Sequence, residues 1–96
     1  MFRINRIDGR SRTVVSIDGR LVGDYLHVAE TCCRQAMSAG RPVDIVLNDV
    51  TEVDEPGRAL LVRLAKAGCR LHGRGLYTSY MVRALKSAVD RRVQTS

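Results

Sequence analysis

The fold is decided by residues 43–61, which read VDIVLNDVTEVDEPGRALL. Val43 to Leu47 is a short apolar run of mainly β-branched residues, as is typical of a strand buried on both faces. Pro56 is preset for a first helical turn, so a helix that buries Leu60, Leu61 and Leu64 is predicted from there to about Ala67. The stretch therefore predicts a buried strand that leads through an acidic loop into a helix.

Upstream of this stretch the sequence predicts two strands, Phe2–Ile7 and Thr13–Ile17, because both are rich in β-branched and alternating apolar residues. The tetrapeptide Ile-Asp-Gly-Arg occurs at residues 7–10 and again at residues 17–20. We interpret this echo as two strands that each end in an Asp-Gly turn, because Asp-Gly pairs favour turns.

A helix is predicted between these strands and the central stretch. Asp24 can cap it, and apolar residues then recur at spacings of three and four up to about Ala39. Gly40 ends the helix, and Pro42 prevents its continuation.

Downstream, the sequence predicts a strand over Arg70–Leu76 and a last helix from about Thr78 to Arg91, followed by a frayed tail over residues 92–96. The predicted order is ββαβαβα. Strands that alternate with helices favour right-handed crossovers onto a partly parallel sheet. We therefore expect an α/β fold, a mixed β-sheet with packed α-helices, in one domain over residues 1–96 with a core over about residues 2–91.

The charges are unevenly distributed along the chain. Sixteen basic and ten acidic residues give a net charge of +6 over 96 residues. Five acids are concentrated in a short central segment and are expected to form a patch near one end of the molecule, which could steer a basic partner. They are Asp44, Asp49, Glu52, Asp54 and Glu55.

Cysteine and histidine show no pattern that predicts chemistry. Three cysteines are an odd number, which argues against a disulfide framework. A metal site could combine Cys69 and His72 with Cys32 and Cys33, but adjacent residues on a helix point about 100° apart. We interpret the cysteines as buried or half-buried structural thiols. Without a metal cluster, a phosphate-binding loop or a nucleophile–base pair, the sequence predicts no enzyme, no metal and no cofactor.

The hydropathy pattern predicts a cytoplasmic protein. The longest strictly apolar run is Ala59–Val62, far short of the roughly 20 residues of a membrane span. The start Met1-Phe2-Arg3 is followed by no apolar segment, so no signal peptide is expected.

Residues 49–61, from Asp49 to Leu61, resemble the signature of STAS domains, the family of bacterial anti-sigma factor antagonists. In that family an apolar strand leads to an Asp-Ser-x-Gly sequence that opens a helix. Asp54 matches the Asp and Gly57 matches the Gly. Gly19-Arg20-Leu21 is similar to the family's G-x-L at the end of its second strand, although Val22 stands where an acidic residue often follows. The resemblance covers about residues 12–90.

The resemblance implies a binding module for signal transduction and transcription regulation. Such antagonists dock on a protein partner, often a serine kinase that is also an anti-sigma factor, and phosphorylation of the serine after the Asp breaks the complex. Related small STAS proteins bind the ATPase of lipid-transporting ABC complexes or belong to larger signalling assemblies. The implied partner-binding residues here are Asp49, Asp54, Glu55, Pro56, Gly57 and Arg58.

The chain departs from the family at the phosphoacceptor, which falls on Glu55 and is followed by Pro56. Neither side chain has a hydroxyl, so phosphorylation at this position is chemically impossible. We expect Glu55 at the N-cap of the helix, where the dipole favours a carboxylate by about 0.3–1 kcal/mol. One interpretation is a charge that only stabilises the helix start, and the other is a permanent stand-in for phosphoserine.

Asp54 and Gly57 also have simple structural interpretations. Asp54 can satisfy backbone amides in the turn, and Gly57 can allow close approach of a neighbouring backbone. For Asn48 and Asp49, which we expect to end the strand, turn chemistry and partner contact stay equally open.

Two further possibilities remain from the sequence. The last helix has a basic side formed by Arg83, Lys86, Arg91 and Arg92, which favours a nucleic-acid-binding domain as an alternative, although no aromatic residues are interleaved with the bases for stacking. Separately, an open sheet edge at Phe2–Ile7 could pair with a second copy and give a homodimer.

Overall fold

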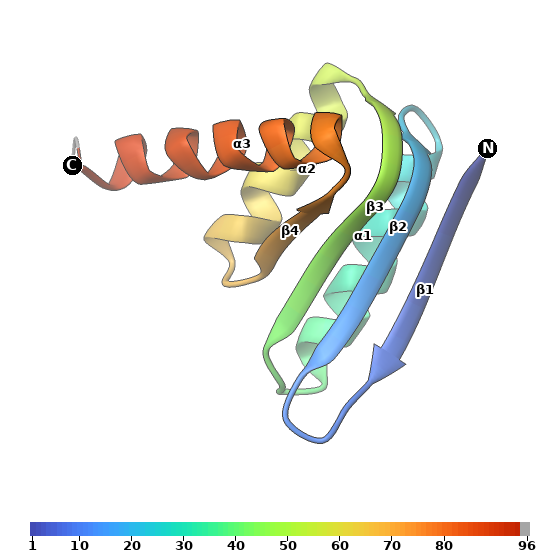
Figure 1. Ribbon diagram of the computed structural model, residues 1–96. Coiled ribbons are helices and arrows are strands. Elements are labelled where there is room, and N and C mark those ends of the chain that lie inside the picture. Colours follow the sequence, from blue (N-terminus) through green and yellow to red (C-terminus); the bar gives the residue numbers. More distant parts are fainter. Residues whose placement is uncertain (95–96) are drawn as a thin grey trace.

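The computed structural model describes residues 1–94, and it contains the predicted order of four strands and three helices (Figure 1). The elements are β1 (Phe2–Asp8), β2 (Thr13–Leu21), α1 (Tyr25–Ser38), β3 (Val43–Val53), α2 (Glu55–Lys66), β4 (Arg70–Arg74) and α3 (Leu76–Gln94).

The strands form one mixed sheet in the order β1-β2-β3-β4. β1 pairs with β2 antiparallel, whereas β2, β3 and β4 run parallel. Helices α1 and α2 connect the parallel strands and lie on the same face of the sheet, behind it in Figure 1, as right-handed crossovers require. The opposite face is not covered by these two helices and is called the open face below. The predicted α/β fold and its element order are confirmed.

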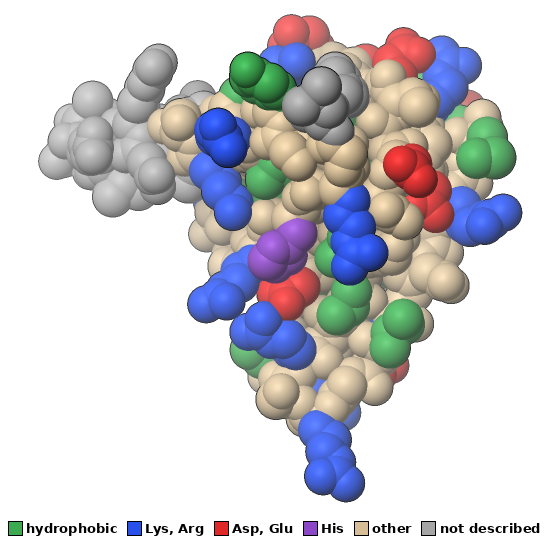
Figure 2. Space-filling model, viewed as in Figure 1, with side chains coloured by type: hydrophobic (Ala, Val, Ile, Leu, Met, Phe, Trp, Pro, Cys, Tyr) green, Lys and Arg blue, Asp and Glu red, His purple; other side chains and the backbone are tan. Residues whose placement is uncertain are grey.

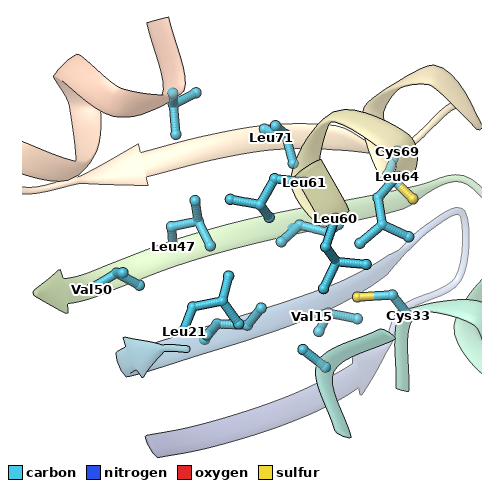
Figure 3. Close-up of a cluster of buried hydrophobic side chains, with 14 of the residues drawn as sticks. Val15, Leu21, Cys33, Leu47, Val50, Leu60, Leu61, Leu64, Cys69 and Leu71 are labelled. Carbon is cyan, nitrogen blue, oxygen red and sulfur yellow. The ribbon is translucent and has the colours of Figure 1, made fainter. Parts of the chain in front are cut away.

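The core lies between the sheet and helices α1 and α2 (Figure 3). Alternate residues of β2 and the first part of β3 point into it, and α2 contributes Leu60, Leu61 and Leu64, as predicted. On α1 the buried residues are Ala29, Cys33 and Ala36, whose spacing of four and three matches the predicted helical face.

The two central strands are longer than predicted. We expected strands to end at Ile17 and Leu47, but β2 continues to Leu21 and β3 to Val53. Both strands pass through an irregularity instead of a turn, because Gly19 (φ 94°) and Asp49 (φ 52°) adopt left-handed backbone conformations that shift the register. The Asp-Gly turn predicted at residues 18–19 is therefore wrong.

The ends of the helices differ slightly from expectation. Asp24 stands at the N-cap of α1 as predicted, but its side chain makes no capping hydrogen bond there. Gly40, with φ 86°, follows the end of α1. α3 starts at Leu76 rather than Thr78 because β4 ends at Arg74, and it continues to Gln94 beyond the predicted Arg91. Residues 92–94 are thus helical rather than tail, and residues 95–96 lie outside the described part.

On α3, Met81 and Leu85 are buried. Within residues 1–94, no helix combines the length and apolarity needed to cross a membrane.

The cysteines are free, with Cys33 and Cys69 buried and Cys32 half-buried, as predicted. Burial raises the pKa of the Cys33 thiol to about 12 and also raises the pKa of Cys69.

Because the thiolate is the reactive form, we expect iodoacetamide at pH 8 to modify Cys32 first. Cys33 and Cys69 should react only after denaturant is added. Peptide mass spectrometry over time checks this order, and rapid native labelling of Cys33 would contradict the packing.

Candidate functional site

The candidate site is the junction where β3 ends and α2 begins, at the end of the sheet where β2 also ends. Asp54 occupies the N-cap of α2 with extended backbone angles (φ −81°, ψ 176°). Its Oδ1 accepts a hydrogen bond from the backbone N–H of Gly57 at 2.8 Å. Its Oδ2 accepts one from the backbone N–H of Gly23 at 3.0 Å. One carboxylate thus joins the start of α2 to the loop between β2 and α1.

The prediction that Glu55 is the N-cap is wrong, because Asp54 takes that position and Glu55 is the first residue of α2. Asp54 is the N-cap because its shorter side chain reaches the backbone N–H of Gly57, three residues along the chain, as N-cap aspartates do. Glu55 is exposed, and within the described residues its side chain accepts no hydrogen bond. The capping role is therefore filled without Glu55, and its carboxylate stays free at the positive end of the helix dipole.

Gly57 is buried and lies against Leu21, the last residue of β2. A Cβ placed on it would lie 2.7 Å from the carbonyl oxygen of Leu21 and 2.9 Å from Asp54 Oδ1. The close approach that the sequence predicted for this glycine is therefore present. Asp54 and Gly57 hold the junction together, while Glu55, Pro56 and Arg58 face solvent.

Asp49 is placed differently from the rest of the predicted site. It is exposed and sits in the irregular part of β3, five residues before Asp54. Its positive φ shows that a strand irregularity, rather than a chain-reversing turn, explains why a short polar residue suits this position.

The five acids do not form one patch, so that expectation is corrected. Asp44 lies near the start of β3, at the far end of the strand, where it is buried and accepts a hydrogen bond from Arg12 at 2.7 Å. Glu52 is paired with Arg20 of β2 at 2.9 Å. Clustering in sequence did not give clustering in space because an 11-residue strand separates its two ends.

Sequence reasoning missed two parts of this junction. One is the backbone N–H of Gly23, which carries no side-chain signal. The other is the Arg20–Glu52 ion pair, which follows from the parallel pairing of these two residues in the sheet. If β2 had been predicted to continue beyond Arg20, its parallel pairing with β3 could have placed Arg20 next to Glu52.

No group of three or more His, Cys, Asp or Glu residues that could hold a metal ion occurs in the part of the chain that the structure describes. His72 lies on the open face of β4, and its Nε2 is 3.9 Å from Asp44 Oδ1.

The element order and the sheet topology are those of the STAS fold, which the resemblance of residues 49–61 predicted. Among solved structures, the chain is similar to the crystal structure of an anti-sigma factor antagonist from Mycobacterium paratuberculosis, with a TM-score of 0.77 and 17% sequence identity. The match covers 96% of this chain and 82% of that one. No protein-family model matches the chain, and no curated protein matches it.

Proposed function

We propose that this chain is a non-enzymatic regulatory module of the cytoplasm that binds a protein partner through the outer surface of the α2 start. That surface, called the α2 rim here, consists of Glu55, Pro56 and Arg58. The observation that carries the proposal is the double hydrogen bond of Asp54, which fixes the first turn of α2 and leaves these three side chains exposed. The fold shared with an anti-sigma factor antagonist supports a regulatory role.

In this proposal Asp54 and Gly57 shape the surface from beneath, and Asp49, five residues earlier in the irregular part of β3, is a further partner contact that the family resemblance implies. Partner chemistry that fits the family resemblance is an anti-sigma factor with serine kinase activity. An accessory role on the ATPase of a transporter or in a larger signalling complex is the second candidate. Because position 55 has no hydroxyl, binding would not be switched by phosphorylation there.

The fixed charge of Glu55 favours its interpretation as a stand-in for phosphoserine, since Asp54 already serves as the cap. A carboxylate carries one charge, whereas a phosphoserine carries about −1.5 to −2, so the mimicry would be partial. On this interpretation the module stays in the state that phosphorylation gives its relatives.

We expect Glu55→Arg to weaken partner binding at least about tenfold while the fold is kept, because it reverses an exposed charge on the α2 rim. The partner is first captured from native lysate at near-physiological salt and identified by mass spectrometry. Its affinity for purified wild type and variant is then measured by calorimetry.

Asp8→Arg is the charge control, because it makes the same charge change at the opposite end of the sheet; since Asp8 also accepts hydrogen bonds from Arg6 and Thr13, circular dichroism first checks that this variant is folded. It should bind like wild type. Glu55→Gln separates the two interpretations of Glu55, since loss of binding on removing only the charge supports the phosphoserine stand-in. Equal affinities for wild type and Glu55→Arg would overturn the α2 rim as the binding surface.

A further inference from the structure

A cavity of about 270 Å³ lies between β4 and α3, away from the α2 rim. Its described lining contains three side chains that carry or can carry positive charge, His72 from β4 and Arg83 and Lys86 from α3, and no carboxylate. The remaining lining residues are Leu71, Gly73, Ser79 and Val82.

The contact between the two elements is tight beside this cavity. A Cβ on Gly73 would lie 2.6 Å from the carbonyl oxygen of Thr78, so the glycine lets the start of α3 sit directly on β4. The hydroxyl of Ser79 donates to the carbonyl oxygen of Gly73 at 3.2 Å. The backbone that carries the cavity wall is thereby fixed.

Two further cations, Arg70 and Arg74, lie on the same face of β4 as His72. Arg70, His72 and Arg74 alternate with the buried Leu71 along β4, so all three point to the open face. Figure 2 shows the histidine of this face with Lys and Arg side chains near it and an acidic side chain directly beside it. Within the described residues, Arg70, Arg74, Arg83 and Lys86 form no ion pair, in contrast to Arg12, Arg20 and Arg34, which are all paired with acids.

Among the described residues, the carboxylate closest to His72 is that of Asp44, and one of its oxygens is already occupied. Asp44 contributes no lining atom, and its Oδ2 accepts the hydrogen bond from Arg12 at 2.7 Å. Its Oδ1 is buried without a hydrogen-bond partner and is 3.9 Å from His72 Nε2. Asp44 therefore places one negative charge beneath the imidazole of His72, whereas Arg70, Arg74, Arg83 and Lys86 pair with no acid within the described residues.

We propose that the cavity between β4 and α3, called the β4–α3 cavity, binds the phosphate or pyrophosphate group of a small phosphorylated molecule. Arg83 and Lys86 donate to the oxyanion from α3, and His72 contacts it from β4. The volume of about 270 Å³ is large enough to hold a phosphate or pyrophosphate group. Phosphate oxygens accept charge-assisted hydrogen bonds from guanidinium and ammonium groups, and these are about twice as strong as neutral ones.

A nucleic acid fits this surface less well than a small phosphorylated molecule. The two aromatic residues near the start of β1 and α1, Phe2 and Tyr25, stack on each other at 4.8 Å rather than lying on β4. Tyr80 of α3, which follows the lining residue Ser79, is exposed, so the described surface offers one ring on which a base could stack rather than a row of them.

The test is a titration of ¹⁵N-labelled protein with sodium pyrophosphate at constant ionic strength, followed by amide chemical shifts. We expect saturable shifts at Leu71–Gly73 and Ser79–Lys86. The double variant Arg83→Ser/Lys86→Ser should weaken binding about tenfold or more. Inorganic phosphate is titrated in parallel and should shift the same amides with lower affinity.

The matched control is Arg63→Ser/Lys66→Ser, because these two exposed residues have the same spacing on α2 and the variant removes the same charge. It should bind pyrophosphate like wild type. Equal weakening by both double variants would show a net-charge effect and overturn the proposal, as would shifts spread over all arginines. If a 12-mer oligonucleotide binds and pyrophosphate does not displace it, the surface is a nucleic-acid site and the small-anion proposal is wrong. Neither result bears on the α2 rim, whose test uses Glu55.

Discussion

Asp54→Ala is expected to lower the free energy of unfolding by about 2–3 kcal/mol, which corresponds to a fall in Tm of roughly 10–20 °C for a domain of this size. The carboxylate accepts from two backbone N–H groups in different loops, at 2.8 Å and 3.0 Å. Removing the carboxylate leaves the Gly57 N–H without its capping acceptor. It also removes the hydrogen bond from Gly23 that joins the loop before α1 to the start of α2. Thermal and urea unfolding followed by circular dichroism measure the loss.

Two variants locate the cause of this loss. Asp54→Asn keeps one carbonyl oxygen for Gly57 but presents an NH₂ group toward the N–H of Gly23, so it should lose about half as much as alanine. Glu55→Ala, one residue along and exposed, should change stability by no more than about 0.5–1 kcal/mol. If alanine at position 54 costs no more than alanine at position 55, the double hydrogen bond does not hold the junction.

Gly57→Ala is expected to destabilise the protein by about 1–3 kcal/mol, although the same change at an ordinary helical glycine stabilises by roughly 0.5–1 kcal/mol. The new methyl group would lie 2.7 Å from the Leu21 carbonyl oxygen, which is backbone of a central strand and cannot move aside. It would also press on the Asp54 oxygen that caps α2. Urea unfolding gives both the sign and the size.

The control is Ala59→Gly, two residues further along α2 at an exposed position. It should cost about 0.5–1 kcal/mol through helix propensity alone. A Gly57→Ala protein that is more stable than wild type would show that α2 can move away from β2, which contradicts the tight junction.

The predictions from the sequence succeeded where a signal is local and periodic. The spacing of apolar residues gave α1 and the buried face of α2, and Gly40 marked the end of α1. Strand ends were harder, because β2 and β3 each continue through a left-handed residue that in sequence looks like a turn. An isolated strand would turn there, but parallel pairing between the two strands keeps both extended on either side of the irregularity.

In the candidate site, too, some features were predicted from the sequence and others were not. The residue types of Asp54 and Gly57 were sufficient to predict that one satisfies backbone amides and the other permits close approach. The N-cap was assigned to Glu55 instead of Asp54, since a proline two positions on marks a helix start only to within a residue or so. Gly23 could not be predicted as the second partner, because a backbone N–H brought there by folding has no sequence pattern.

The sequence by itself thus determined the order of elements, the core faces of the first two helices, the acidic side chain at a position where phosphorylation is impossible, and the basic residues of the last helix. Only the tertiary structure decided which charges meet. It separated Asp44 from the other four acids, paired Glu52 with Arg20, and set Arg83 and Lys86 beside His72. The physical reason is that hydrophobic periodicity acts over a few neighbouring residues, whereas charge neighbours are set by strand register and by which helix packs on which strand.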